Sequence, residues 1–361
     1  MSPSLFSRRG LLVGASAAIA GAACAEPPSL KAAAKRAGRR FGCAVEPQTL
    51  AADGDFRDLV AQQCDLLIPE NAMKWNALRP SADAFDFAAA DAVIAAARAQ
   101  GAQVHGHCLV WHEAMPNWAA GPIDGPTARD RLESHVAAVA GRYRGAVASW
   151  DVINEAVERN DRRADGLRRS LWLEALGPDY LLTALDAAHR AAPQARLAIS
   201  DYGLEYDHVT WMVEKRGTML ALLRDLLRRG APLHALSIQG HLLGAEPASF
   251  GLGLRRFLSD VADLGLEIYV TELDVNEQTL TGSAAARDAI VADIYRRFVD
   301  TILNEPAVRF VATWGLSDRY TSKTEMFPHA DGLDVRPLPF DRDLRPKAAA
   351  RALQAAFQRA A

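Results

Sequence analysis

The sequence predicts an α/β fold, a single (β/α)8 barrel of the TIM type. After residue 40, the chain of 361 residues alternates short runs rich in β-branched and aromatic residues with longer stretches of helical period. No Pro- or Ser-rich linker and no internal repeat interrupts this alternation, so we expect one domain. An open, doubly wound sheet is the alternative with the same order of elements.

Eight runs of strand type follow one another along the chain. Parallel strands need long crossovers, and the stretches between the runs have helical period, as in Leu220, Leu223 and Leu227. Eight β-α units of this size are the number that closes a barrel. The expected strands are 41–45, 65–70, 103–110, 147–154, 196–201, 235–240, 266–272 and 309–315.

The first 25 residues have the form of a twin-arginine signal peptide. Arg8 and Arg9 precede a weakly apolar stretch, and the small residues on either side of Cys24 suit cleavage. An ordinary secretory signal and a lipoprotein signal that uses Cys24 are the alternatives. We therefore expect residues 1–25 to be removed, residues 26–361 to form the catalytic barrel, and the protein to be exported to the periplasm or secreted into the medium.

Charge and cysteine content limit the partners of the mature chain. The formal net charge is −3 for the full chain and, without Arg8 and Arg9, −3 − 2 = −5 for the mature chain, with no basic patch, which argues against nucleic acid and against an anionic membrane after signal removal. We expect a monomer. Cys43, Cys64 and Cys108 remain after residue 25, each in an apolar context, and their odd number leaves at least one thiol free. We expect all three to pack in the core.

Polar and aromatic residues gather after seven of the eight expected strands, where barrel enzymes place their active sites. Glu155 and Glu272 each end an apolar run, and buried strands rarely end in unpaired carboxylates without a chemical reason. Two carboxylates facing each other across one bond are the minimum apparatus of a glycosidase. The other residues at strand ends are Glu70, Asn71, His107, Asn154, Asp201, Tyr202, Gln239, His241 and Trp314.

Amide and imidazole side chains near paired carboxylates suit a sugar, because hydroxyl groups need both donors and acceptors. Trp75, Trp111 and Trp314 could offer flat faces to pyranose rings, although core packing is an equal alternative for each of them alone. Lys74 is the sole lysine between positions 36 and 214 of a chain that otherwise favours arginine, which suggests that its compact ammonium group matters.

Six ordered motifs resemble those of glycoside hydrolase family 10, the β-1,4-xylanases. The resemblance extends from about Phe41 to Lys347, nearly the whole mature chain, and implies the (β/α)8 fold of that family. The motifs are Glu70-Asn-Ala-Met-Lys74-Trp75, His105-Gly-His107-Cys-Leu-Val-Trp111-His112, Trp150-Asp-Val-Ile-Asn154-Glu155, Ile238-Gln239-Gly-His241, Val270-Thr-Glu272-Leu-Asp274 and Trp314-Gly-Leu-Ser-Asp318.

The resemblance implies a retaining endo-1,4-β-xylanase that degrades xylan and xylo-oligosaccharides without a cofactor or a metal ion. Glu155 would be the general acid/base and Glu272 the nucleophile, with His241 and Asp274 supporting the nucleophile. The residues expected to contact the sugar chain are Glu70, Asn71, Lys74, His107, Trp111, Asn154, Tyr202, Gln239, His241 and Trp314.

The chain departs from the pattern of this family at three positions. Ser200 stands where an asparagine is usual, His105 where an arginine is common, and Ser322 where a tryptophan is expected over the substrate. We expect an altered lid at Ser322, unless Phe327 fills the gap. His105 and His107, followed by His112 and Glu113, also allow a metal-dependent hydrolase. A barrel that binds glycans without cleaving them is a further alternative.

Overall fold

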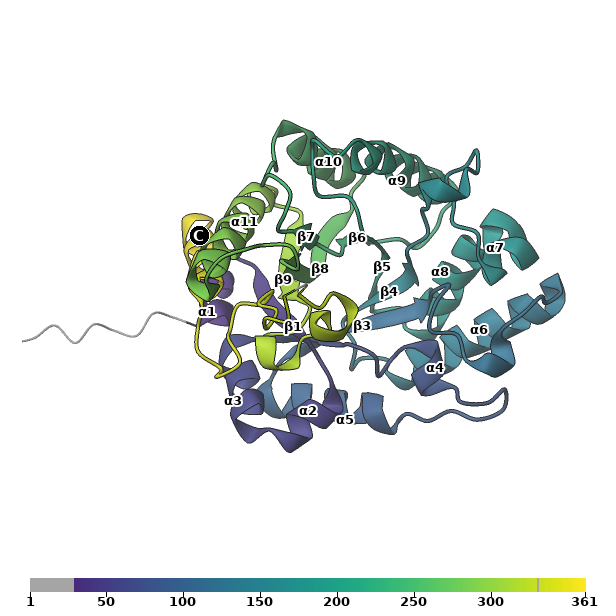
Figure 1. Cartoon of the computed structure of the whole chain (residues 1–361). Helices are drawn as coiled ribbons and strands as arrows, with labels where there is room; N and C mark the ends of the chain where they lie inside the picture. Colours follow the sequence, from purple (N-terminus) through teal and green to yellow (C-terminus); the bar gives the residue numbers. More distant parts are fainter. Residues whose placement is uncertain (1–28, 330) are drawn as a thin grey trace, which may run out of the picture.

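Eight parallel strands close into a barrel in the computed structural model, which describes residues 29–329 and 331–361 (Figure 1). Each strand pairs with its neighbour in chain order, and β1 pairs with β9 to complete the ring. The predicted fold class is confirmed and the open sheet is excluded. The barrel strands are β1 (Arg40–Val45), β2 (Leu66–Pro69), β3 (Gln103–Val110), β4 (Ser149–Asn154), β5 (Arg196–Asp201), β6 (Ala235–Ile238), β8 (Glu267–Asn276) and β9 (Val308–Thr313).

Helices cover the outside of the barrel, and several begin at a side chain that caps the first turn. Asp53, Asp124, Ser170 and Ser283 each accept a hydrogen bond from a backbone amide of the helix that follows. The helices are α1 (Leu30–Arg36), α2 (Pro47–Ala52), α3 (Gly54–Gln63), α4 (Trp75–Leu78), α5 (Ala88–Gln100), α6 (Gly125–Arg142), α7 (Leu171–Leu176), α8 (Tyr180–Ala191), α9 (Thr210–Arg228), α10 (Leu252–Ala262), α11 (Ala284–Ile302), α12 (Lys323–Met326) and α13 (Ala348–Arg359).

Apolar side chains fill two zones, one between the strands and the helices and a smaller one inside the barrel. The inner zone contains the stacked rings of Tyr269 and Phe310. Cys43, Cys64 and Cys108 are free and buried, as predicted. Burial raises the pKa of the Cys64 and Cys108 thiols well above the ordinary value, so both remain protonated and unreactive.

The seventh predicted strand differs from the structure in one respect that affects the site. We expected it to end at Glu272, and this expectation was wrong, because β8 continues to Asn276. A register shift between Val270 and Leu273 takes the second half of β8 away from regular pairing with β9, and a short extra strand, β7 (His241–Leu243), pairs with that half. Glu272 therefore lies inside β8 and not at its end, and β8 is paired with β9 on one side and with β7 on the other.

The segment after β9 crosses the carboxyl end of the barrel before the chain reaches α13, in yellow-green in Figure 1. This segment includes α12, whose residues line the central cleft. Among the described helices, none is long and apolar enough to cross a membrane. The predicted signal peptide lies outside the described residues.

Candidate active site

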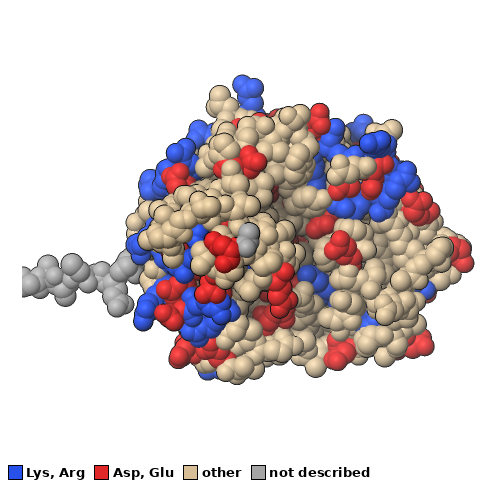
Figure 2. Space-filling view, in the orientation of Figure 1, with Lys and Arg blue, Asp and Glu red and all other residues tan. Residues whose placement is uncertain are grey.

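A cleft of about 530 Å3 opens at the carboxyl ends of the strands. Figure 2 looks onto this face, where acidic side chains surround the hollow at its centre. The cleft is lined by both predicted catalytic glutamates and by every residue expected to contact the sugar: Glu70, Asn71, Lys74, His107, Trp111, Asn154, Tyr202, Gln239, His241 and Trp314. The structure thus brings together residues from positions 70 to 314.

Glu155 directly follows β4 and has a φ of 59°, a left-handed backbone conformation that residues other than glycine rarely adopt. Such strain persists only where the surroundings impose it, and it is common at functional sites. The amide of Glu155 donates to the Ser200 carbonyl at 2.7 Å, and Nε of Arg168 donates to the Glu155 carbonyl at 2.8 Å. These two hydrogen bonds fix the backbone and direct the carboxyl group into the cleft.

Glu272 is held more tightly, with 4% of its surface exposed. Its Oε2 lies 3.2 Å from Nε2 of His241, and its Oε1 lies 3.8 Å from Nδ1 of His107. Burial and the hydrogen bond on Oε2 restrict rotation of the carboxylate, which suits an atom that must attack from one direction.

His241 is a cation at neutral pH. Burial alone would lower its pKa, but the carboxylate of Asp274 outweighs that cost and raises the pKa to about 9. Nδ1 of His241 lies 3.0 Å from Asp274 Oδ1. Both ring nitrogens therefore carry protons, so His241 donates to Asp274 on one side and to Glu272 on the other.

Gln239 links the two glutamates. Its Nε2 donates to Oε1 of Glu155 and to Oδ1 of Asn154, each at 3.2 Å, while its backbone carbonyl accepts from the amide of Glu272 at 2.8 Å. One residue after β6 therefore fixes the position of one carboxyl group relative to the other.

His105 and His107 converge on one buried carboxylate, that of Asp151. Nε2 of His105 lies 2.9 Å and Nδ1 of His107 lies 3.0 Å from Asp151 Oδ2. Although burial raises the pKa of Asp151, the two histidines outweigh it and hold that pKa below its ordinary range. Within residues 29–329 and 331–361, no group of three or more His, Cys, Asp and Glu side chains is arranged to hold a metal ion. The histidine pair supports the wall of the cleft instead.

A family model described as glycosyl hydrolase family 10 matches residues 29–356. The chain belongs to glycosyl hydrolase family 10. Endo-1,4-beta-xylanase B of Paenibacillus barcinonensis is 34% identical over 338 residues, which cover 89% of this chain and 96% of the relative. Two curated relatives from other bacteria, endo-1,4-beta-xylanase B of Thermotoga neapolitana and beta-1,4-xylanase of Dictyoglomus thermophilum, are 32% and 33% identical.

Solved structures agree with this assignment. Native xylanase 10B from Thermotoga maritima matches with a TM-score of 0.83 at 29% identity, covering 92% of this chain and 98% of that protein. Xylanase 10B from Thermotoga petrophila, solved in complex with xylobiose, matches with a TM-score of 0.79 at 29% identity, covering 92% and 97%. The family 10 chain described here is therefore a glycoside hydrolase.

The strand ends of β2 and β3 supply one wall of the cleft in this family 10 protein. Nζ of Lys74 donates to Asn71 Oδ1 at 2.8 Å and lies 5.2 and 5.6 Å from the ring centroids of Trp111 and Trp314. Burial, followed by the charge of neighbouring carboxylates, raises the pKa of Glu70 to about 7, against the opposing charge of Lys74. Lys74 thus anchors a polar wall between two aromatic side chains.

Trp75 does not line the cleft. Its ring stacks on His135 with centroids 3.7 Å apart, packs against Trp172 and is buried. The expectation that it could face a sugar was wrong, because α4 turns the side chain away from the cleft and into the core. Core packing was the other possibility for this residue.

Sequence reasoning missed four charged residues of the site. Arg168 donates to the Tyr202 hydroxyl at 3.0 Å and lies 3.3 Å from Glu158, which accepts from the same hydroxyl at 2.8 Å. Glu46 accepts from the Asn71 amide. The fourth is Lys323, described below. Arg168 and Glu158 lie in the loop beyond β4 and outside the motifs, so no local pattern marked them. Glu46 directly follows β1, so the rule that polar residues gather at strand ends could have found it.

The lid segment contacts the site through a residue that we did not expect. Ser322 and Phe327 both line the cleft, as expected of the altered lid. The side chain that contacts the support of Glu272, however, is Lys323, whose Nζ lies 3.1 Å from Oδ2 of Asp274. Ser322 precedes α12, so the helix turns Lys323 inward beneath the lid.

Proposed function

We propose that this protein is an endo-1,4-β-xylanase that cleaves internal bonds of xylan and xylo-oligosaccharides by a retaining double displacement. The observation that supports it most is the unlike pair of carboxyl groups in one cleft. Glu155 is a partly exposed side chain with the neutral amide of Gln239 as a donor, whereas Glu272 is buried beside a cationic imidazole. Two carboxyl groups in different surroundings suit an acid and a nucleophile.

In the first step, Glu155 donates its proton to the oxygen of the leaving sugar while Glu272 attacks the anomeric carbon. The glycosidic bond breaks and a covalent glycosyl-enzyme ester forms on Glu272. His241 donates to Glu272 and so holds its carboxyl group in place for the attack. The side chain of Asn154, held by Gln239, is placed to meet a hydroxyl of the sugar being cleaved.

In the second step, water replaces the ester. The negative charge of Glu272 is absent at this stage, so Glu155 accepts a proton from the water. The oxygen of that water attacks the anomeric carbon on the face that the leaving sugar had occupied. The product keeps the β configuration and both carboxyl groups return to their initial states. His107 and Asp151 keep the nucleophile's wall in place throughout.

The assignment of roles is tested by two substitutions. Glu272→Gln is expected to abolish turnover on every substrate. Glu155→Ala is expected to lose activity on xylan but to retain formation of the intermediate with an activated aryl xylobioside, and added azide is expected to speed the second step. Equal losses on both substrates without rescue by azide would contradict these roles. An inactive wild type that still binds xylan would instead indicate a binding protein.

We further propose that residues 1–25 direct export by the twin-arginine route and that residues 26–361 act as a monomer. The support is the Arg8-Arg9 pair and the three buried free cysteines, since this route carries proteins that have folded in a reducing compartment. Arg8→Lys combined with Arg9→Lys keeps the positive charge and is expected to block export. Undiminished export of the double variant would remove this proposal.

A further inference from the structure

Lys323 is a buried cation that no step above has used. Its side chain is 8% exposed, and its Nζ lies 3.1 Å from Asp274 Oδ2 and 3.5 Å from Nδ1 of His241. Burying an ammonium group costs free energy unless it is paired, so its place beside Asp274 requires a compensating contact. Asp274 provides that contact, and its side chain is 1% exposed.

The two oxygens of Asp274 each contact a different cation. Oδ1 lies 3.0 Å from His241 and Oδ2 lies 3.1 Å from Lys323. A carboxylate held at both oxygens cannot turn about its terminal bond without losing one contact. Its orientation fixes the direction of His241 Nδ1, and the rigid ring then determines where Nε2 points, which is toward Glu272 at 3.2 Å. The contacts form one chain from Lys323 to Glu272.

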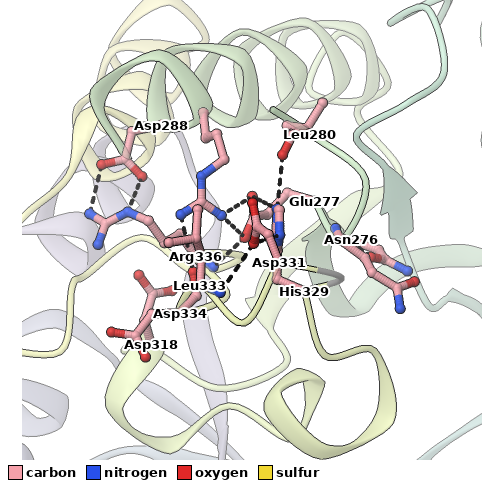
Figure 3. Close-up of polar contacts among 12 residues, drawn as sticks. Asn276, Glu277, Leu280, Asp288, Asp318, His329, Asp331, Leu333, Asp334 and Arg336 are labelled. Atoms are coloured by element: carbon pink, nitrogen blue, oxygen red, sulfur yellow. Dashed lines mark hydrogen bonds and ion pairs between the residues drawn. The ribbon is translucent and has the colours of Figure 1, made fainter. Parts of the chain in front are cut away.

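The backbone that carries Lys323 is held at both ends. The Lys323 amide donates to Oγ1 of Thr321 at 3.2 Å. Beyond α12, a polar cluster ties the chain to two other elements (Figure 3). Nε2 of His329 lies 2.8 Å from the carbonyl of Leu280 in the loop after β8, and Arg336 binds both carboxylate oxygens of Asp288 in α11 at 2.8 and 2.7 Å. Lys323 therefore stands on an anchored segment and enters the site in one position.

We propose that Lys323 is a positioning residue for the nucleophile, whose ammonium group holds Asp274 and thereby aims His241 at Glu272. This inference rests on the proposed role of Glu272. It assigns a function to the lid segment of this chain at the position next to Ser322, where the expected tryptophan is missing. At this place α12 brings a cation to the wall of the cleft.

The proposal has a consequence that can be measured directly on His241. The groups that act on this ring are Asp274 and Glu272 from β8, Lys323 from α12 and the buried Glu205 after β5. Among them, Lys323 lowers the pKa of His241 by its charge. Removing the ammonium group is therefore expected to raise the pKa of His241 above the value of about 9, because the positive charge that counteracts the neighbouring carboxylates is then gone.

The experiment compares Lys323→Met and Lys323→Gln, which remove the charge, with Lys323→Arg, which keeps it. The exposed neighbour Thr324, changed to Ala, is the matched control on the same helix. In protein labelled with 15N-histidine, the NMR titration of His241 is expected to move to higher pH in the Met and Gln variants. It is expected to remain near the wild-type value in the Arg variant and in the Thr324 control.

Turnover is measured alongside, on xylan and on an aryl xylobioside. We expect kcat of the Met and Gln variants to fall about tenfold on both substrates with little change in KM, the order expected when one charge-assisted hydrogen bond in the contacts to the nucleophile is lost. The loss should be equal because Glu272 attacks both substrates. Lys323→Arg should recover much of it.

An unchanged titration of His241 in a folded Lys323→Gln protein, with wild-type kcat, would overturn the proposal. A loss of kcat in Thr324→Ala equal to that of Lys323→Met would overturn it as well, because the effect would then belong to the helix. If Met at this position does not fold, the Gln variant alone decides. An active Glu272→Gln would contradict the proposed function itself, whereas an inactive Glu272→Gln combined with an unaffected Lys323 variant would reject this inference alone.

Discussion

Replacing Arg168 by methionine tests how Glu155, the proposed general acid, is held. The guanidinium donates to the backbone carbonyl of Glu155 at 2.8 Å and lies 3.7 Å from its Oε2, and it is largely buried between Glu155, Glu158 and Tyr202. Methionine preserves most of the side-chain volume and removes every donor. The substitution therefore releases a residue that the fold keeps in a strained conformation, with φ of 59°.

The size of the effect follows from these contacts. A hydrogen bond from a charged donor contributes about 1.5–3 kcal/mol, and about 1.4 kcal/mol corresponds to a factor of ten in rate. We expect that half to all of one such bond, about 0.75–3 kcal/mol, is lost in the transition state when Glu155 is free to move, so kcat on xylan is expected to fall about 3- to 140-fold. The free energy of unfolding is expected to fall by about 2 kcal/mol, because Glu158 loses its buried cationic partner. The fall is limited because Glu158 keeps its contact with the Tyr202 hydroxyl and part of its access to water.

The assay is the ratio of kcat/KM on xylan to kcat/KM on an aryl xylobioside with a good leaving group. The aryl group needs little protonation, so a misplaced acid should harm xylan hydrolysis more, and the ratio is expected to fall. Arg163→Met is the matched control, because Arg163 pairs with Asp165 in the same loop outside the cleft. An unchanged ratio in Arg168→Met, with the Arg163 variant equal to wild type, would refute the view that Arg168 positions the acid.

Two further predictions concern the cleft. Glu70 has a pKa of about 7 in the folded protein against 4.5 ordinarily, so the folded state binds the proton of Glu70 more tightly than the unfolded state does. The folded state therefore loses stability, on the order of 2–3 kcal/mol, as the pH rises from about 4.5 to 7. Glu70→Gln is expected to remove this loss, and urea unfolding at pH 4.5 and pH 8 would measure it. A stability difference independent of pH would disprove the assignment. Ser322→Trp is expected to tighten binding of xylotriose by about 1 kcal/mol, because an indole would fill space in the cleft beside Phe327 and Met326. The filled space is expected to disfavour a sugar with an extra hydroxymethyl group and so to raise the ratio of xylan to β-1,4-glucan activity. Calorimetry with xylotriose and rates on both polymers would test it, and no change in either would reject the lid hypothesis.

The sequence by itself determined the barrel and the residues that face its mouth. Strand and helix periods are local properties, and the carboxyl ends of parallel strands must meet at one end of a barrel, so Glu70, Gln239 and Trp314 could be placed together without coordinates. Resemblance of the ordered motifs added the chemical roles. The predictions of the fold and of the shared cleft succeeded because each depended on a few adjacent residues and on topology, whereas the chemical roles stay predictions.

Only the tertiary structure decided the contacts between elements that no motif connects. Lys323 and Asp274 are separated by 49 positions and meet because the segment after β9 folds across the cleft, while Arg168 meets Glu155 because the loop after β4 turns back. Trp75, next to Lys74 in a motif, faces the core because one helical turn reverses its direction. Side-chain direction and long-range ion pairing depend on how whole elements pack, and that packing sets the charges around Glu272, the proposed nucleophile.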